Sequence, residues 1–149
     1  MTLRLAIASD VPAIQQIVQD AYAPHTIRMG QTPGPMLDDY AVLIVAGHVR
    51  VSGDPIQGIL VLIPAANHML LDNGAIAKDA QGQGLGTQLV QSAMDIARAS
   101  GHQTLRLYCH ITMVENMRLY RRLGFVETHR VTEYGLDRVY FESDLTLHS

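Results

Sequence analysis

Residues 81–86 read Gln-Gly-Gln-Gly-Leu-Gly, and they constrain the fold of this 149-residue chain more than any other segment. An apolar run typical of a strand precedes them at 70–77, and a helical pattern follows at 85–100. Glycine tolerates positive φ and lets a ligand approach the backbone closely. The amide N–H groups of such a loop and of the first helical turn attract negative charge. We therefore expect a strand–loop–helix unit whose backbone binds a phosphate or pyrophosphate.

Spacing excludes two other phosphate-binding loops. The chain has no G-x-x-x-x-G-K-[ST] loop, and no G-x-G-x-x-G near its amino terminus with an acidic residue about 20 positions later. The remaining alternative is a tight strand–helix connection that binds nothing. The pattern present, Gln-x-x-Gly-x-Gly, resembles the cofactor loop of the GNAT superfamily of acetyl-CoA-dependent N-acetyltransferases.

Composition favours one globular domain over residues 1–149, because 48% of the residues are apolar and only 17% are charged. The single Cys109 excludes an intramolecular disulfide, and the histidines lack the spacing of a metal site, so we expect no metal. The longest apolar stretch, 56–66, is too short to span a membrane. The first residues lack the apolar core of a signal peptide, so a cytoplasmic location is expected.

A net charge of −3 leaves no broad basic surface for nucleic acid, and no nucleic-acid partner is expected. Arg118, Arg121 and Arg122 do form a local cluster. The favoured interpretation is the last turn of a helix, where cations suit the helix dipole.

Hydrophobic periodicity predicts a mixed arrangement of strands and helices along the whole chain. The region 22–35 is predicted to be irregular because it contains several Pro and Gly residues, and Asn73-Gly74 is predicted to form a β-bulge. The pattern is that of an α/β (α+β) fold with helices on both faces of a mixed sheet. The expected strands are 3–7, 48–52, 56–65, 67–77, 104–110, 125–132 and 138–147, and the expected helices are 10–21, 36–47, 85–100 and 112–124.

A second motif strengthens the resemblance to the GNAT superfamily. Residues 119–125, Leu-Tyr-Arg-Arg-Leu-Gly-Phe, look like that family's short helix running into a Gly-Phe strand start. The resemblance covers nearly the whole chain. It implies a mostly antiparallel GNAT-type sheet that is splayed between the fourth and fifth strands.

The resemblance also implies which residues bind acetyl-CoA as co-substrate. The pyrophosphate would be held by backbone amides of the loop and the helix start, and the cofactor arm would pair with the strand end, where an amide polarises the thioester carbonyl. Lys78 and Gln81 depart from the Pro and Arg that many relatives carry at these positions. The implied residues are Ile76, Ala77, Lys78, Gln81, Gly82, Gln83, Gly84, Leu85, Gly86 and Thr87.

Tyr120 matches the family tyrosine that faces the cofactor sulfur, and it is the predicted general acid. A phenol with a pKa near 10 stays protonated at neutral pH and can donate to a thiolate. The alternative is a tyrosine that only packs beside Met117 and Leu123. Asn116, one helical turn earlier, is a predicted cofactor ligand or else a solvated residue, because many relatives place their Asn where this chain has Met113.

An amine arrives as an ammonium with a pKa near 10, so a proton acceptor is required. Asp72 is the predicted base. Strict alternation would place it on one face of its strand with His68, Leu70, Gly74 and Ile76. A solvated aspartate, or one that caps the neighbouring bulge, is the alternative.

The irregular region and the helix that follows it are expected to wall the acceptor pocket, as they do in relatives, although an ordinary surface loop is the alternative. The predicted substrate contacts are Tyr22, Arg28 and Tyr40. Arg28 would pair with a carboxylate, and Asp38 or Asp39 would attract the amine. The predicted activity is transfer of acetyl to a small primary amine. The alternatives are acetylation of a protein or peptide and acyl-CoA binding without catalysis. A homodimer is the expected assembly.

Overall fold

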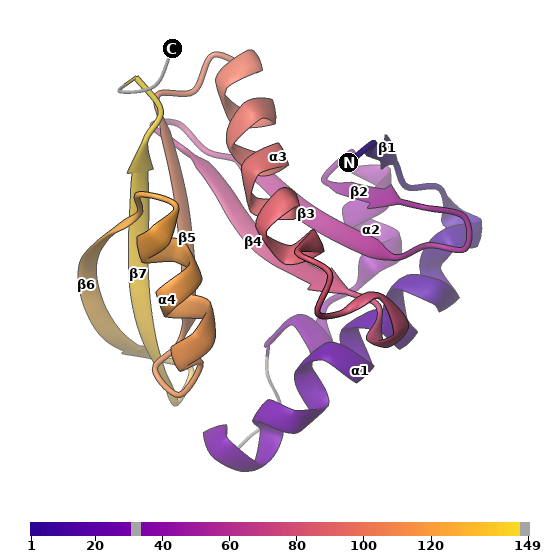
Figure 1. Cartoon of the computed structure of the whole chain (residues 1–149), viewed down its shortest axis with the longest axis horizontal. Helices are drawn as coiled ribbons and strands as arrows, with labels where there is room; N and C mark the ends of the chain where they lie inside the picture. Colours follow the sequence, from indigo (N-terminus) through magenta and orange to yellow (C-terminus); the bar gives the residue numbers. More distant parts are fainter. Residues whose placement is uncertain (31–33, 147–149) are drawn as a thin grey trace.

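The computed structural model describes residues 1–30 and 34–146, leaving aside the side chains of residues 27–29, 34 and 37 (Figure 1). The strands are β1 (Arg4–Leu5), β2 (Val49–Ser52), β3 (Gly58–Pro64), β4 (Met69–Ile76), β5 (Thr104–His110), β6 (Val126–Glu133) and β7 (Leu136–Asp144). The α-helices are α1 (Val11–Met29), α2 (Tyr40–Val45), α3 (Leu85–Ala99) and α4 (Val114–Arg122). Short 3-10 helices lie at Ala8–Asp10, Gly34–Leu37 and Lys78–Ala80.

The seven strands form one sheet in the order β1-β2-β3-β4-β5-β7-β6, with β4 and β5 as its parallel pair. This confirms the mixed, mostly antiparallel sheet. The parallel pairing runs from Met69↔Leu105 to Leu71↔Leu107, and β4 then continues to Ile76 while β5 continues to His110. Figure 1 shows the two strands adjacent at one end and widely separated at the other, which confirms the splay.

A β-bulge lies at the point where the splay begins. Leu62 pairs with Leu71 and Val61 pairs with Asn73, so Asp72 is the extra residue on β4. The prediction of a bulge at Asn73-Gly74 was therefore wrong. Gly74 pairs regularly, and a Cβ there would lie 3.3 Å from Cδ2 of Leu89, so this glycine permits close packing of α3.

The bulge also reverses the side-chain alternation along β4. Leu71 faces the core beneath α3 and α4, whereas beyond the bulge Ala75 faces the core beneath α1 and α2. The Asp72 carboxylate accepts a hydrogen bond of 3.2 Å from the hydroxyl of Tyr108. Tyr108 lies on the face of β5 that is not covered by α3 and α4. The predicted face that joined Asp72 to Gly74 and Ile76 was wrong, because one extra residue intervenes.

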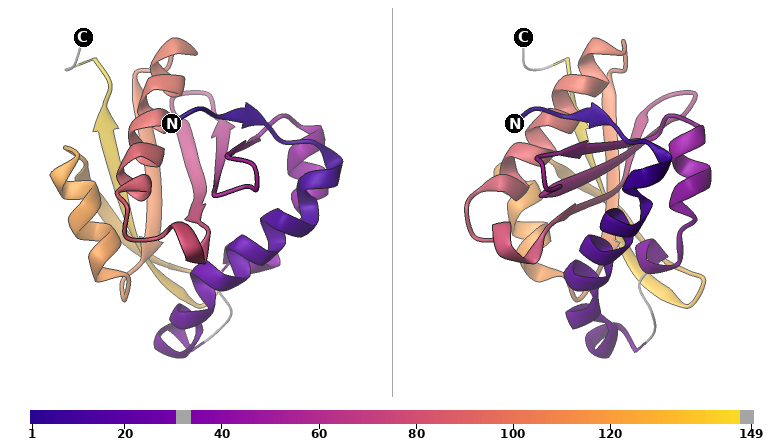
Figure 2. Two further views of the ribbon diagram at one scale, coloured as in Figure 1. Left: turned by 45° about the vertical axis from the view of Figure 1, so that its right-hand side comes forward. Right: turned by 90° about the vertical axis from the view of Figure 1, so that its right-hand side faces the viewer.

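Helices cover both faces of the sheet and bury two apolar clusters. Figure 2 shows α3 and α2 on opposite sides of it. One cluster joins the sheet to α3 and α4 and includes Leu89, Ala93 and Phe141. The other joins the sheet to α1 and α2 and includes Ile14 and Tyr40. Burial of these clusters supplies the main driving force for the fold.

Helix α1 is longer than the sequence pattern indicated, because it continues through Pro24 to Met29. Proline removes one intrahelical N–H donor, here at an exposed turn, and contacts of Tyr22 with both cores hold the helix together. The helix ends at Gly30, whose φ of 72° and N–H bond to the Thr26 carbonyl form a left-handed cap. Residues 22–29 are therefore helical rather than irregular. The predicted loop residues 31–33 lie outside the described part of the chain.

Three smaller expectations were also wrong. The first strand is exposed and is limited to Arg4–Leu5, not the expected 3–7. The residues after it turn into α1, and the Asp10 carboxylate stabilises this turn by accepting hydrogen bonds from Arg4 and from the Ile7 N–H. The helix expected at 36–47 divides into two, because the Asp39 side chain accepts from the Val42 N–H and starts α2 anew. Helix α4 begins at Val114 and not at the expected Thr112, whose hydroxyl bonds to the His110 ring instead.

Candidate active site at the splay

The glycine loop connects the 3-10 turn Lys78–Ala80 to α3. Gly82 and Gly84 have φ values of 80° and 78°, which explains why glycine is needed at both. Gly86 lies in the first turn of α3, where a Cβ would meet nothing within 4 Å. The backbone is thus uncovered, and the first-turn N–H groups of a 15-residue helix converge on open space.

The exposed edge of β4 lies beside this loop. Ala77 donates its N–H to the Gln57 carbonyl at 2.7 Å, so alternation turns the N–H and C=O of Ile76 away from β3 and toward the splay. The Ile76 carbonyl accepts a bond of 3.1 Å from Nε2 of Gln81. An extended ligand could therefore pair with β4 as an added strand, with the Ile76 N–H as a donor.

Two cavities meet in the splay. The first, which we call the loop-side cleft, runs from the glycine loop between α1, β4, α3 and α4 and includes Gly74, Ile76, Gln81, Gly86 and Leu89 in its lining. The second, the hairpin-side pocket, is lined by Pro35, Asp72, Tyr108, Cys109, His110, Leu136 and Arg138. Both are also lined by Tyr22, Met113, Asn116 and Tyr120, so these side chains mark the junction.

Tyr120 projects from α4 into the junction. Its ring packs against Phe125 and Phe141 with centroids 5.9 and 5.8 Å away. Burial raises the pKa of the Tyr120 hydroxyl, the nearby Cys109 raises it further, and a hydrogen bond with Asn116 opposes the rise. The hydroxyl is therefore protonated at neutral pH and can donate a proton.

Asp72 faces the same space from β4. Burial raises the pKa of its carboxyl, while the hydrogen bond from Tyr108 and the charge of Arg138 oppose the rise. Arg138 is held over the Tyr108 ring at 4.4 Å and pairs with Glu133 at 2.9 Å. A carboxylate with a raised pKa is a stronger proton acceptor than an exposed aspartate.

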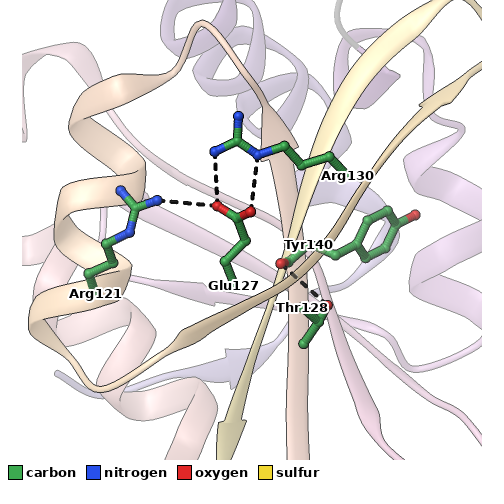
Figure 3. Close-up of polar contacts among 5 residues, drawn as sticks. All are labelled: Arg121, Glu127, Thr128, Arg130 and Tyr140. Carbon is green, nitrogen blue, oxygen red and sulfur yellow. Dashed lines mark hydrogen bonds and ion pairs between the residues drawn. The ribbon is translucent and has the colours of Figure 1, made fainter.

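Ion pairs at the surface tie the end of α4 to β6 (Figure 3). Glu127 accepts two bonds of 3.0 Å from Arg130 and one of 3.4 Å from Arg121. These bonds, with that from Arg130 the largest cause, lower the pKa of the Glu127 carboxyl. Arg121 is thus engaged within the fold, in the last turn of α4 where cations suit the dipole.

The profile of the acetyltransferase (GNAT) family matches residues 14–125, which include the glycine loop, the splay and α4. The chain belongs to the GNAT acetyltransferase family.

Several known proteins are similar to this chain, one in sequence and others in fold. N-alpha-acetyltransferase 30 of Schizosaccharomyces pombe is 35% identical over 63 residues, and this stretch spans only 42% of each chain. An acetyltransferase structure from Salmonella typhimurium, solved with its cofactor acetyl-CoA, superposes with a TM-score of 0.72 at 21% identity, covering 100% of this chain and 96% of that one. The ribosomal-protein-S18-alanine N-acetyltransferase of Escherichia coli gives 0.75 at 20% identity, covering 97% and 93%. The two structures show that the fold is shared.

Six of the predicted cofactor and catalytic residues line the two cavities. Ile76, Gln81, Gly86, Asn116 and Tyr120 line the loop-side cleft, and Asp72 lines the hairpin-side pocket. The rest of the proposed cofactor set, Ala77, Lys78, Gly82, Gln83, Gly84, Leu85 and Thr87, forms the strand end, the loop and the first turn of α3.

The predicted substrate residues are placed differently from one another. Tyr22 lies at the junction of the two cavities. Tyr40 is 2% exposed, and its hydroxyl donates to the Pro35 carbonyl, so it lies behind the pocket wall. Arg28 is in the last turn of α1, and its side chain falls outside the described atoms.

Sequence reasoning missed Asn73, Tyr108 and Arg138. The alternation of residues 104–110, Thr-Leu-Arg-Leu-Tyr-Cys-His, already placed Tyr108 opposite the apolar face of its strand, and that signal could have been used. Asn73 and Arg138 reach the site only through tertiary pairing, with no local signal.

Two findings concern other kinds of site. Within residues 1–30 and 34–146, no group of three or more His, Cys, Asp or Glu side chains is placed to hold a metal ion. Among the described helices, none has the length and apolar character needed to cross a membrane.

Proposed function

We propose that this protein transfers an acetyl group from acetyl-CoA to a primary amine by direct attack within a ternary complex. The observation that carries the proposal is the meeting of the loop-side cleft and the hairpin-side pocket at Tyr120. One cavity begins at an anion-binding loop, the other contains a carboxylate, and a protonated phenol stands between them.

The loop-side cleft suits acetyl-CoA. The open space over Gly82, Gly84 and Gly86 leaves room for a pyrophosphate against the backbone amides. The β4 edge at Ile76 suits an amide-bearing arm, and the Ile76 N–H can stabilise negative charge on a carbonyl oxygen. When bound, acetyl-CoA supplies an acetyl thioester whose carbonyl carbon can be attacked by an amine.

Side chains of the protein accept and donate the protons that the reaction transfers. The Asp72 carboxylate accepts a proton from the ammonium form of the acceptor, directly or through water, which frees the nitrogen lone pair. The Tyr120 hydroxyl donates its proton to the departing sulfur and regains one, directly or through water, from the attacking nitrogen, which loses its second proton as the amide forms. Burial of both groups is compatible with this division, because a raised pKa makes Asp72 a stronger proton acceptor and keeps Tyr120 protonated until the sulfur departs.

We propose an amine on a small molecule as the acceptor, since the hairpin-side pocket is narrow and is walled by α1, Pro35, β4, β5 and β7. A second candidate is the α-amino group of a protein N-terminus. It is favoured by the descriptions of two relatives, the ribosomal-protein-S18-alanine N-acetyltransferase of E. coli and the yeast N-alpha-acetyltransferase 30. A cytoplasmic location and a homodimer complete the proposal, and a chain whose single cysteine, Cys109, is buried needs no oxidising compartment to fold.

The test is release of free thiol from acetyl-CoA in the presence of single amines: polyamines, amino acids and short peptides with free N-termini. Mass spectrometry of the acceptor must then find one added acetyl group. Tyr120→Phe should lower the rate by roughly 10²- to 10⁴-fold. Failure of every amine class to accept acetyl would refute the activity, and acetylation of peptides alone would select the second candidate.

A further inference from the structure

A chain of hydrogen bonds runs from the buried core to the junction of the two cavities. The Tyr22 hydroxyl donates to Oδ1 of Asn73 at 2.7 Å, and Nδ2 of Asn73 donates to the Tyr40 hydroxyl oxygen at 2.8 Å. The Tyr40 hydroxyl in turn donates to the Pro35 carbonyl at 2.6 Å. Asn73 and Tyr40 are each 2% exposed, so solvent does not compete for these bonds.

The Pro35 carbonyl fixes the direction of every bond in this relay. A carbonyl oxygen can only accept, so the single hydroxyl proton of Tyr40 is committed to it. The Tyr40 oxygen must then accept from Asn73, which orients the amide with Nδ2 toward Tyr40 and Oδ1 toward Tyr22. If the Asn73 amide were turned over, its Oδ1 would face the Tyr40 oxygen, whose proton is already donated to the Pro35 carbonyl, and no hydrogen bond could form between them.

The hydroxyl proton of Tyr22 is therefore also committed. A longer contact of 3.5 Å to the Gly74 carbonyl competes for the same proton and does not free it. Burial raises the pKa of Tyr22 well above its usual value, so the proton is retained at neutral pH. The remaining lone pairs of the Tyr22 oxygen are the part of this group left for a ligand at the junction.

Tyr120 has the opposite polarity at the same junction. Burial raises the pKa of the Tyr120 hydroxyl, so this group keeps its proton at neutral pH and can donate it to a ligand. Two tyrosines thus line the junction, one as a donor and one as an acceptor.

We propose that the Tyr22 oxygen accepts an N–H of the acceptor amine, and that Asn73 and Tyr40 are positioning residues that hold it as an acceptor. This inference rests on the proposed acetyl transfer, in which the ammonium or amine is the N–H donor at the junction. A bond to one N–H directs the nitrogen lone pair and leaves another proton to face Asp72, which lines the same pocket.

The kinetic test compares Tyr22→Phe with the unchanged protein, using an amine that the thiol-release assay has identified. A hydrogen bond to a charged group is worth enough that its loss should lower kcat/KM for the amine by roughly 10- to 100-fold. KM for acetyl-CoA should stay within about twofold, because Tyr22→Phe keeps the ring that lines the loop-side cleft and removes only a hydroxyl bonded at Asn73, away from the glycine loop. Tyr40→Phe should produce a smaller fall, because it removes the constraint on Asn73 and keeps the Tyr22 hydroxyl.

Tyr140→Phe is the matched control. It also removes one partly buried hydroxyl, here bonded to Glu133 at 2.9 Å, and it should leave kcat/KM for the amine unchanged. Circular dichroism and melting of each variant verify that the protein is folded. An active Tyr22→Phe protein with unchanged kcat/KM for the amine would overturn the proposal.

A second readout is independent of catalysis. Nuclear magnetic resonance can follow hydrogen exchange of the two side-chain amide protons of Asn73. The proton that donates to Tyr40 should be protected from exchange, should lose protection in Tyr40→Phe, and should keep it in Tyr22→Phe. The reverse pattern would overturn the assigned polarity even in an active protein. Protection as expected with no amine acetylated would mean that the relay exists and that the proposed function, with the amine contact, is wrong.

Discussion

Gly86 offers a substitution that separates ligand binding from folding. It lies in the first turn of α3, it has no positive φ, and a Cβ would meet nothing within 4 Å. Replacing it by valine adds an apolar group that points into the loop-side cleft, which Gly86 lines. The unliganded protein should therefore fold normally, and its stability should change by only a few tenths of a kcal/mol, roughly, because valine is a slightly better helix residue than glycine.

The liganded protein should behave differently. Acetyl-CoA at 100 times its dissociation constant stabilises a binding protein by about 2.7 kcal/mol. For a chain of this length that corresponds to a rise in melting temperature of roughly 5–10 °C. In Gly86→Val the added group occupies the space needed against the backbone, so the rise at the same ligand concentration should fall to roughly 2 °C or less.

The assay is a thermal melt with and without acetyl-CoA, on the unchanged protein, Gly86→Val and Ala13→Val. The last is the control, because it adds bulk to the exposed first turn of another helix, α1. Ala13→Val should retain the full ligand-induced rise. An undiminished rise in Gly86→Val would refute the assignment of this loop to the cofactor, and a large loss of unliganded stability would refute the open space around Gly86.

Three further predictions test other parts of the site. Tyr120→Phe should abolish most transfer and still show the ligand-induced rise in melting temperature, whereas a loss of both would indicate a packing role only. Asp72→Asn should raise the melting temperature at pH 7, because the raised pKa means that the ionised carboxylate destabilises the folded state, and this gain should disappear as the pH falls and Asp72 protonates. In the same variant the rate of transfer should be low and should no longer rise with pH as the carboxyl ionises, as the unchanged protein's rate should. Gly74→Ala should cost about 1–3 kcal/mol in urea unfolding, because its Cβ would lie 3.3 Å from Cδ2 of Leu89, which is 3% exposed and has little room to move, and an unchanged midpoint would contradict this packing.

The parts of the fold that were predictable from sequence are those encoded by contiguous residues. The glycine loop and the α4 motif each specify a turn and a helix within a few positions, and both are found where they were expected. Strand periodicity likewise gave the correct element order and the mixed sheet. Local signals sufficed because each pattern and the backbone geometry that it requires lie in the same short segment.

The wrong predictions concern features of the fold that depend on contacts between residues far apart in the sequence. Helix α1 continues through Pro24 where the partly buried Tyr22 packs against both cores, a tertiary contact that local helix propensity does not report. The face of Asp72 depends on a single extra residue in the pairing of β4 with β3, and such a slip reverses the alternation. In the relay, Asn73 bonds to Tyr40, which is 33 positions away in the sequence, and to Tyr22, which is 51 positions away. These residues could therefore not be grouped before the fold was known.

A crystal structure of the protein with bound acetyl-CoA would test the proposed acetyl transfer at atomic detail. We expect the pyrophosphate on the amides of residues 82–86, the thioester carbonyl oxygen on the Ile76 N–H, and the sulfur within hydrogen-bonding distance, roughly 3.5–4 Å, of the Tyr120 hydroxyl. A cofactor bound elsewhere, or one whose sulfur lies far from Tyr120, would contradict it.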